Sequence, residues 1–588
     1  MFCLLLVAVL VPAALGGAGD TLDQVKVAFS NVAVGDQALH EAVTVKSGSL
    51  PMWLEGSLVR HACGVFGNVD TNTTMIDTID HLFDCITMLQ SYHFHDGKAT
   101  YSNQFLDTNQ LQVWKKYNED MRQSSLWFET VYSNQNITAM EKEEEDMTQL
   151  DRPYSTAHVS WWTLGDKAVA FGEYINGASM DVHNNKYIGN FLLKPSLWAG
   201  WSAVSVPAHE QTDENGMVWT VVAVVKAGEL GNVHQKRVII KIDPTTMTQT
   251  AEGEYSYPDG DSQLCKPGEV YPDPAARFGY MHAIQLTKKY IILPETSYLN
   301  DPCSNIRHDD NLGRYDQSYT YEPTVNSNVY LMDRTTKEVT KIPIDPMFAT
   351  HSMGAFEDDT TGNIYFDMMT YANADIYTKW TYRQHAVSNE NYPNDLTRLV
   401  RYTIDRNLHW RGLKSLIKSP DADVGTKAFE FPSMNPAYHG KPYKYIYTIQ
   451  NPFKRFGALI KLNVETGIVT RKEMPDGYFP TEPIFVAAPD ATNEDDGVVV
   501  VGGINGKDKV GFILAFNASN MEMIYHADAP KLTLFGLHAH FYPFTKGCSE
   551  DDCTPSSSTS LSAGLMLSFV GVLGLLRNWV GSFGTIRL

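Results

Sequence analysis

Short runs of branched and aromatic residues recur along this chain, and they predict β-strands. Gly, Pro, Asn and Asp, which favour turns, separate these runs. The clearest runs are residues 218–225, 238–242, 290–293, 364–368, 443–449 and 498–501. Aromatic residues make up 11 % of the chain, which also holds 28 Pro and 42 Gly. The pattern favours a turn-rich, all-β fold over a helical bundle.

A turn motif repeats between some of these strands. In it an apolar residue precedes Asp or Asn, and a turn containing Thr or Gly follows. The strong copies are residues 242–246, 332–336 and 462–467, and the weaker copies are 404–407 and 516–519. The Asp or Asn side chain can accept a hydrogen bond from the backbone two residues on, which closes a turn between antiparallel strands.

The spacing of the strong copies indicates a repeated architecture. They begin at residues 242, 332 and 462, at intervals of 90 and 130 residues. These intervals are near two and three units of the roughly 40–50 residues that one propeller blade uses. Unrelated hairpins in a meandering β protein would also give some copies, but the near-integral spacing favours a β-propeller.

The charge of the chain narrows its range of partners. Its 588 residues include 47 Lys and Arg against 68 Asp and Glu, a formal net charge of −21. This balance argues against nucleic acid and against electrostatic docking on anionic lipid. Hydrophobic residues make up 43 % of the chain, which is ample material for a globular core.

The amino terminus predicts entry into the secretory pathway. Residues 1–18 combine a short apolar run with a small-residue cleavage region, which is typical of a signal peptide; a signal anchor is the alternative. Three N-x-S/T triplets fit this reading as glycosylation sites, at Asn72, Asn136 and Asn517. We therefore expect the folded domain to span residues 19–545.

Removing the signal peptide leaves an even number of cysteines. They are Cys63, Cys85, Cys265, Cys303, Cys548 and Cys553. An even number in an oxidising compartment favours disulfides, although six cysteines allow fifteen connectivities. Pairing neighbours along the sequence would join Cys63 to Cys85, Cys265 to Cys303 and Cys548 to Cys553.

The carboxyl terminus predicts membrane attachment outside the cell. A Ser-rich linker, residues 546–560, precedes a hydrophobic segment, residues 561–588. Its uncharged run, 561–576, is shorter than the roughly 20 residues of an untilted span. A small-residue site, a polar spacer and an apolar tail fit a GPI signal. Arg577 and Arg587 fit instead a membrane span with a basic cytoplasmic tail. A buried core helix is disfavoured because the linker separates the segment from the domain.

Two stretches break the strand pattern. Residues 109–152 include the acidic run 140–146, which predicts a solvated insertion. Residues 372–395 are polar and aromatic without a strand period, and such a long excursion over one face is often a functional lid.

Several short segments resemble the carotenoid cleavage oxygenase family, in particular its animal branch of β-carotene oxygenases and retinoid isomerohydrolase. They are residues 56–64, 81–84, 95–99, 429–435 and 481–486. The similarity covers the chain from about residue 50 to residue 543. It implies a seven-bladed β-propeller with a cap of loops and helices over a metal face.

The same resemblance implies an iron centre. Its four ligands fall on His209, His282, His351 and His538, which are too far apart in sequence to form a local metal motif. His540 is the alternative to His538, and only the family pattern separates them. The family's outer carboxylates fall on Glu173, Glu430 and Glu482.

The residue types suit this chemistry. Neutral imidazoles suit Fe²⁺, and carboxylates behind them can accept the second ring N–H and fix its orientation. Three acids cannot serve four histidines, so one histidine needs another partner. Aromatic and apolar residues near the ligands are candidates for a substrate tunnel, with ordinary core packing as the alternative: Phe278, Tyr280, Tyr371, Leu537 and Phe541.

The resemblance implies an Fe²⁺ dioxygenase. With O2 as co-substrate, it would cleave a carbon–carbon double bond of a carotenoid or apocarotenoid into aldehydes or ketones. One alternative is a retinyl-ester isomerohydrolase of the same family. A second is a membrane-anchored propeller that binds carotenoid or lipid without turnover. A generic propeller receptor, the third, would bind no metal.

Overall fold

The computed structural model describes most of the predicted domain. The described residues are 37–65, 85–108, 157–227, 233–258, 273–301, 318–377, 397–418, 429–450, 457–533 and 536–544, with Gln24, Val27, Leu111, Gln112 and Lys115. The chain divides into two units, residues 1–544 and 545–588, and every described residue belongs to the first.

Several predictions lie outside the described residues. These are the signal peptide, the Ser-rich linker, the C-terminal segment, most of the acidic insertion and of the 372–395 excursion, and Asn72, Asn136, Cys265, Cys303, Cys548 and Cys553. Within the described part of the chain, no helix combines the length and apolar character that a membrane crossing requires.

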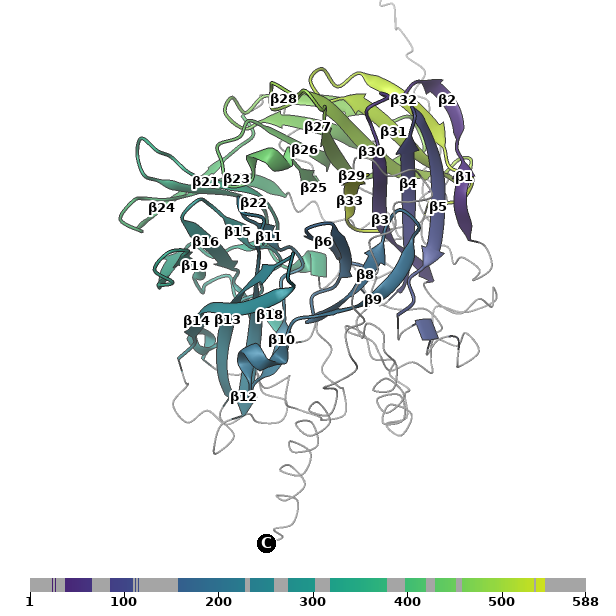
Figure 1. Ribbon diagram of the computed structural model, residues 1–588. Coiled ribbons are helices and arrows are strands. Elements are labelled where there is room, and N and C mark those ends of the chain that lie inside the picture. The colour runs from purple at the N-terminus through teal and green to yellow at the C-terminus, as the bar shows by residue number, and fades with distance from the viewer. Residues whose placement is uncertain are drawn as a thin grey trace, which may run out of the picture. The chain divides into compact units, whose positions relative to one another are not determined.

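Seven antiparallel sheets of four or five strands form the blades of a β-propeller, which confirms the predicted fold class (Figure 1). Blade 1 contains β6 (Ser160–Leu164), β7 (Lys167–Phe171), β8 (Asn176–Asp181) and β9 (Lys186–Leu192). Blade 2 contains β10 (Ser202–Ser205), β11 (Gln211–Thr212), β12 (Val218–Ala227), β13 (Val233–Asp243) and β14 (Thr248–Ser256). Blade 3 contains β15 (Gln285–Leu286), β16 (Tyr290–Glu295), β19 (Ser327–Asp333) and β20 (Val339–Ile344).

The remaining blades follow in chain order. Blade 4 contains β21 (Phe348–Glu357), β22 (Ile364–Tyr371), β23 (Arg398–Ile404) and β24 (Trp410–Ser415). Blade 5 contains β25 (Phe429–Ser433), β26 (Tyr445–Gln450), β27 (Ala458–Asn463) and β28 (Val469–Glu473). Blade 6 contains β29 (Tyr478–Ala487), β30 (Gly497–Asn505), β31 (Val510–Asn517), β32 (Met523–Asp528) and β2 (Thr44–Gly48).

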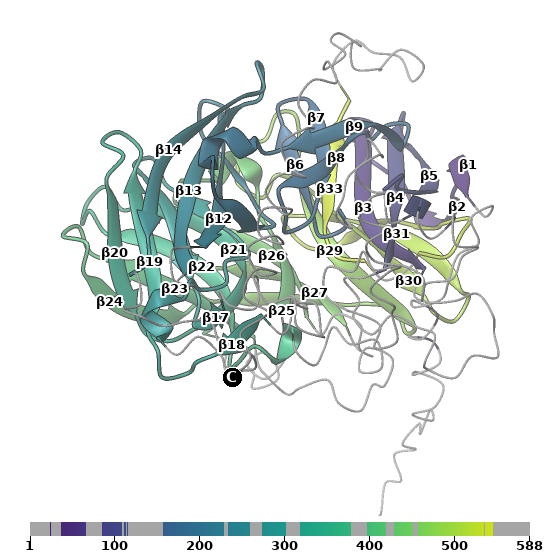
Figure 2. The ribbon, with the colours of Figure 1, turned by 90° about the horizontal axis from the view of Figure 1, so that it is seen from below.

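Blade 7 closes the ring with strands from both ends of the domain. It contains β33 (Ala539–Pro543), β3 (Gly56–Val65), β4 (Ile86–His95), β5 (Lys98–Phe105) and β1 (Ala38–Ala42). The late strand β33 pairs with the early strand β3, from Arg60 opposite Ala539 to Gly56 opposite Pro543. Figures 1 and 2 both show yellow β33 beside purple β3. The pairing joins the two ends of the ring by main-chain hydrogen bonds.

Smaller elements complete the described fold. Strands β17 (Tyr298–Asn300) and β18 (Tyr319–Tyr321) form a separate pair. Short 3₁₀ helices begin with proline, whose fixed φ suits a first helical position: η5 (Pro195–Trp198), η7 (Pro274–Ala276) and η11 (Pro436–Tyr438).

The core lies between adjacent blades. In β30 the side chains of Val499 and Val501 pack with Tyr447 and Leu459 of blade 5, whereas Val498 and Val500 pack toward blade 7. Both faces of this middle strand are therefore buried, which explains why it reads as a continuous apolar run. Each such valine contributes about 1.5–3 kcal/mol relative to full exposure.

The predicted turn motif is confirmed at the same place in five blades, between the third and fourth strands. Asp243, Asp333 and Asn463 each accept hydrogen bonds from the backbone N–H groups two and three residues on. Asp405 and Asn517, in the weaker copies, accept from the N–H two residues on. The side chain thus fixes the outer hairpin of each of these five blades.

The number of blades predicted between the copies of this motif, in contrast, was wrong. The copies at residues 242 and 332 lie in adjacent blades, 2 and 3, and the copy at 462 lies in blade 5. The intervals of 90 and 130 residues therefore correspond to one and two blades. Blade 3 is long because residues between β16 and β19 carry the extra β17–β18 pair.

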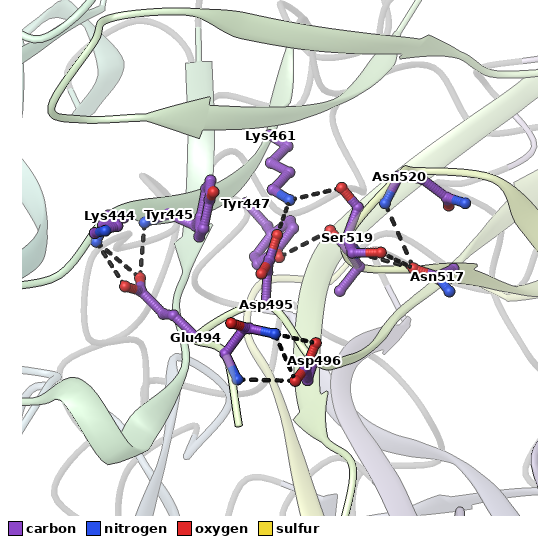
Figure 3. A network of polar contacts seen from close by, with 12 residues as sticks. Lys444, Tyr445, Tyr447, Lys461, Glu494, Asp495, Asp496, Asn517, Ser519 and Asn520 are labelled. Carbon is purple, nitrogen blue, oxygen red and sulfur yellow. Dashed lines mark hydrogen bonds and ion pairs between the residues drawn. The ribbon is translucent and has the colours of Figure 1, made fainter. Parts of the chain in front are cut away.

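A polar network connects blades 5 and 6 (Figure 3). The buried ammonium of Lys461 lies 2.5 Å from Asp495 and donates to the carbonyl of Ser519 at 2.9 Å. Glu494 accepts the backbone N–H groups of Lys444 and Tyr445. These contacts hold the loop after β29 against blade 5 and against the turn at Asn517.

Cys63 and Cys85 form a disulfide, one of the bonds expected from pairing neighbours. The bond joins the end of β3 to the residue before β4 and closes a loop with a sequence separation of 22. Loops of this size gain about 3 kcal/mol from such a bond in the chain-entropy account.

Candidate metal centre

Each of the seven blades contributes one residue to a ring of histidines and glutamates. Five of these residues lie on the first strand of their blade or just before it, whereas Glu173 lies between β7 and β8 and His209 lies between β10 and β11. The first strands of neighbouring blades contact one another from blade 3 through blade 7 to blade 1. The residues, in blade order, are Glu173, His209, His282, His351, Glu430, Glu482 and His538.

The four predicted histidines converge. One ring nitrogen from each of His209, His282, His351 and His538 lies within 4.8 Å of the others. Nε2 of His538 is 2.9 Å from Nε2 of His351 and 3.2 Å from Nε2 of His209. Three of the rings are buried and His209 is half-buried. The structure therefore brings together four side chains that are far apart in sequence.

β-Bulges turn three members of the ring inward. The strand register shifts between Ala349 and Ser352, around His351. It shifts again between Glu430 and Ser433, and between Pro480 and Pro483 around Glu482. A bulge re-aims a side chain that regular alternation would point elsewhere, and bulges are common beside functional sites.

A bridge between blades 2 and 3 positions His209 and His282. The N–H of His209 donates to the carbonyl of His282 at 3.2 Å, and His209 pairs with Ala283 in a parallel bridge. Trp162 of β6 donates from Nε1 to the carbonyl of Ala208 at 2.7 Å. The segment 208–209 is thereby held by the backbone of blade 3 on one side and by a side chain of blade 1 on the other.

Each of the three glutamates bonds one histidine through Nδ1. His282 donates to Glu173 at 2.5 Å, and His351 donates to Glu430 at 2.6 Å. His538 donates to Glu482 at 2.9 Å, and Glu482 also accepts the N–H of Ala539. With the proton on Nδ1, each Nε2 keeps its lone pair free and aimed at the cluster. His209 has no such carboxylate within the described residues.

Burial controls the protonation of this cluster. Burial, reinforced by the neighbouring imidazoles, holds the pKa values of His209 and His538 well below the usual value. Burial also opposes protonation of His351, but the adjacent Glu430 raises its pKa overall. Burial raises the pKa of Glu482 to about 8. Neutral imidazoles are the form that binds a metal ion.

The donor set fits a divalent transition metal ion. Facing lone pairs on His351 and His538 repel each other unless a cation lies between them. Four imidazoles suit Zn, Cu, Fe or Ni, because softer sites would use thiolates and harder sites would use oxygen. The carboxylates behind the rings return negative charge without entering the donor set.

An aromatic network adjoins the centre on the side of His282. The hydroxyl of Tyr280 donates to Glu173 at 2.5 Å and lies 2.6 Å from the hydroxyl of Tyr377. Tyr377 also lies 3.4 Å from Nδ1 of His282. Tyr377 stands in the first part of the predicted excursion, but nothing in its local sequence indicated this contact.

Phe431 is a second residue that the sequence reasoning missed. Its ring lies 6.0 Å from the ring of His351 and 5.6 Å from that of His538. Its φ is +58°, which is unusual for a bulky residue. It follows Glu430 within the Phe-Glu-Phe-Pro segment that resembles the family, and that segment was the available signal.

The remaining predicted residues take different places. Phe278 is fully buried and packs with Tyr257 and Tyr319, and Tyr371 is partly buried against Phe348. Leu537 is half-buried beside His538. Phe541 packs against Phe94 in the core of blade 7, and His540 lies 3.2 Å from the hydroxyl of Thr163, outside the cluster.

Comparison with known proteins identifies the family. The model of the retinal pigment epithelial membrane protein family (RPE65) matches residues 33–543. A carotenoid isomerooxygenase of Galleria mellonella is 24 % identical over 536 residues, which cover 84 % of this chain and 93 % of that protein. The β,β-carotene 15,15'-dioxygenase of Mus musculus is 22 % identical over 547 residues, which cover 84 % of this chain and 88 % of that protein.

The fold agrees with a solved structure. A variant of the apocarotenoid oxygenase of Synechocystis superposes with a TM-score of 0.68 at 18 % identity, covering 88 % of this chain and 98 % of that chain. The resemblance found in the sequence is confirmed: the chain belongs to the RPE65 family, the family of carotenoid cleavage oxygenases.

Proposed function

We propose that this protein is an Fe²⁺-dependent oxygenase that cleaves a carbon–carbon double bond of a carotenoid or apocarotenoid into carbonyl products. The observation that carries the proposal is the convergence of four imidazoles, three of them bonded to carboxylates. The names of its relatives, a carotenoid isomerooxygenase and a β,β-carotene dioxygenase, supply the substrate class.

The side chains have separable tasks in this reaction. His209, His282, His351 and His538 would hold the ion, which when bound supplies the site where O2 is activated beside the substrate. Glu173, Glu430 and Glu482 keep the proton of each partner histidine on Nδ1. The aromatic rings around Tyr280 and Phe431 present apolar surface next to the centre and limit the access of water.

Metal content and product analysis test the proposal together. The purified protein should hold one iron per chain and, in air, should convert a member of a panel of carotenoids and apocarotenals into aldehydes or ketones. A protein without metal would support the receptor alternative. Iron with release of retinol from retinyl ester, and no cleavage, would support the isomerohydrolase. Iron with bound but unchanged carotenoid would support the binding propeller.

We also propose that the protein resides on the extracellular face of the membrane and carries N-linked glycan. The Cys63–Cys85 disulfide supports an oxidising compartment. Asn517 lies in an outer turn, where its Oδ1 accepts from Ser519, and its Nδ2 makes no hydrogen bond among the described residues (Figure 3).

Two enzymes test this location on intact cells. Peptide N-glycosidase should reduce the mass of the protein, and by less in Asn517→Gln than in the wild type. Phosphatidylinositol-specific phospholipase C should release the protein if the C-terminal anchor is GPI and should leave it bound if the anchor is a membrane span. An unglycosylated protein recovered from the cytosol would refute the location.

A further inference from the structure

A second group of metal-type ligands lies apart from the four histidines. Cys63, Cys85 and His158 each present a ligand atom, and these atoms all lie within 4.8 Å of one another. All three residues are almost fully buried, with exposures of 1 %, 0 % and 2 %. The two sulfur atoms are bonded to each other in the structure. Two sulfurs and an imidazole are also the donors of a common class of zinc site.

A fourth candidate ligand stands beside this group. His61 lies two residues before Cys63 on β3, so both side chains point to the same face of the strand. Its ring is fully buried and lies 4.3 Å from the ring of Trp161. The backbone of His158 lies within hydrogen-bonding reach of the His61 ring, so the two histidines are close neighbours.

The packing of the fold alone does not explain why a histidine, with two polar ring nitrogens, is buried at position 61. One ring nitrogen of His61 approaches the backbone of His158, but neither Nδ1 nor Nε2 makes a hydrogen bond of good geometry within the described residues. Burying an unpaired polar group costs about 1–3 kcal/mol. A phenylalanine would give the same packing against Trp161 without that cost. Weakly bonded ring nitrogens beside the cluster of Cys63, Cys85 and His158 therefore indicate a ligand-binding role for His61.

We propose that Cys63, Cys85, His158 and His61 form a redox-gated site for a thiophilic divalent ion, with Zn²⁺ as the best fit. In the oxidised protein the sulfurs form the disulfide and the site is closed. A dithiol reductant transfers two electrons and two protons to the S–S bond, which gives two thiols and leaves the reductant as its own disulfide. The thiols lose their protons on binding the ion, and two thiolates and two imidazoles complete a tetrahedral donor set.

This site has a direct connection to the iron ligands. The N–H of His61 donates to the carbonyl of His538 at 3.2 Å. The test must therefore distinguish metal bound at the cysteines from metal bound at the four histidines. Co²⁺ serves this purpose because thiolate ligands give it intense charge-transfer absorption in the near ultraviolet, and imidazole ligands do not.

The experiment uses the full-length protein without oxygen. Dithiothreitol reduces the protein, thiol titration checks completeness because the sulfurs are buried, and gel filtration then removes the reductant. Co²⁺ is added, followed by Zn²⁺ in competition. Reduced protein should gain one Co²⁺ per chain with thiolate absorption, and oxidised protein should not. The gain should disappear in Cys63→Ser/Cys85→Ser, and affinity should fall about tenfold or more in His158→Gln.

A control variant and an alkylation measurement complete the experiment. His93→Gln removes another buried histidine of blade 7 and should leave the gain unchanged. In the wild type, Zn²⁺ should protect Cys63 and Cys85 from alkylation, measured by peptide mass spectrometry, and this arm needs no variant that might misfold. Equal thiolate absorption with and without reduction, equal gain in the double variant, or alkylation of both cysteines despite Zn²⁺ would each overturn the proposal.

Discussion

The replacement Glu430→Gln separates the charge of an outer carboxylate from its geometry. Oε2 of Glu430 accepts from Nδ1 of His351 at 2.6 Å and from the N–H of Phe431 at 3.1 Å. The amide oxygen of glutamine can accept both hydrogen bonds, so His351 should keep its orientation. The negative charge disappears, in a position where Glu430 is only 5 % exposed and solvent screens little.

The size of the effect follows from the hydrogen bond. Bonds to charged groups contribute about 1.5–3 kcal/mol, and neutral bonds about 0.5–1.5 kcal/mol. The difference, about 1–1.5 kcal/mol, corresponds to a change in affinity of roughly five- to tenfold. We therefore expect Glu430→Gln to bind Fe²⁺ about five- to tenfold more weakly. Glu430→Ala also leaves Nδ1 of His351 unpaired, and we expect a loss nearer 100-fold, the upper end for outer partners.

Anaerobic titration of apoprotein with Fe²⁺ against a competing chelator measures these affinities. Glu494→Gln is the matched control, because Glu494 is also buried and accepts backbone N–H groups in blade 5, but bonds no histidine. The control should bind iron as the wild type does. If Glu430→Gln and Glu430→Ala fold and also retain wild-type affinity, the carboxylate does not tune the metal and our reasoning about the centre is wrong.

Three other predictions test separate parts of the structure. His538→Ala should abolish iron binding while His540→Ala keeps it, measured as iron per chain; the reverse result would exchange the two assignments. Gly279→Ala should weaken iron binding several-fold in the same titration, because a β-carbon there would overlap the carbonyl of Thr296 and displace the segment that carries the third-blade ligand; unchanged affinity would show that the segment adapts. Burial holds the pKa of His93 well below the usual 6.5, so below that pH the unfolded state takes up a proton that the folded state does not. The free energy of unfolding should fall there by about 1.4 kcal/mol per pH unit. Urea unfolding at several pH values should show that the free energy of unfolding of His93→Gln depends less steeply on pH; an equal dependence would contradict this role of His93.

The fold was largely predictable because its signals are local. Asp333 and Asn463 close their turns with neighbouring backbone groups, so a short segment contains the whole interaction. The number of blades was harder to predict from the sequence, because connections such as the one carrying β17 and β18 lengthen a blade without changing its hairpins.

The candidate site was predictable only through family resemblance. The positions of His351, Glu430 and Glu482 depend on β-bulges. A bulge leaves no periodic pattern of residues in the sequence, because its position depends on the register with the neighbouring strand. The contact of Tyr377 with Tyr280 joins residues 97 positions apart, and no local pattern encodes such a separation.

The distribution of the centre over all seven blades ties metal binding to closure of the ring. Glu173 of blade 1 bonds His282 of blade 3, so the carboxylate reaches past blade 2. His538 enters only when β33 pairs with β3, a contact between the two ends of the domain. An open ring would therefore lack one of the four imidazoles. If the ion binds only the closed ring and its free concentration is 100 times the dissociation constant, binding stabilises the closed ring by about 2.7 kcal/mol. The metal would therefore stabilise the whole propeller and not one blade.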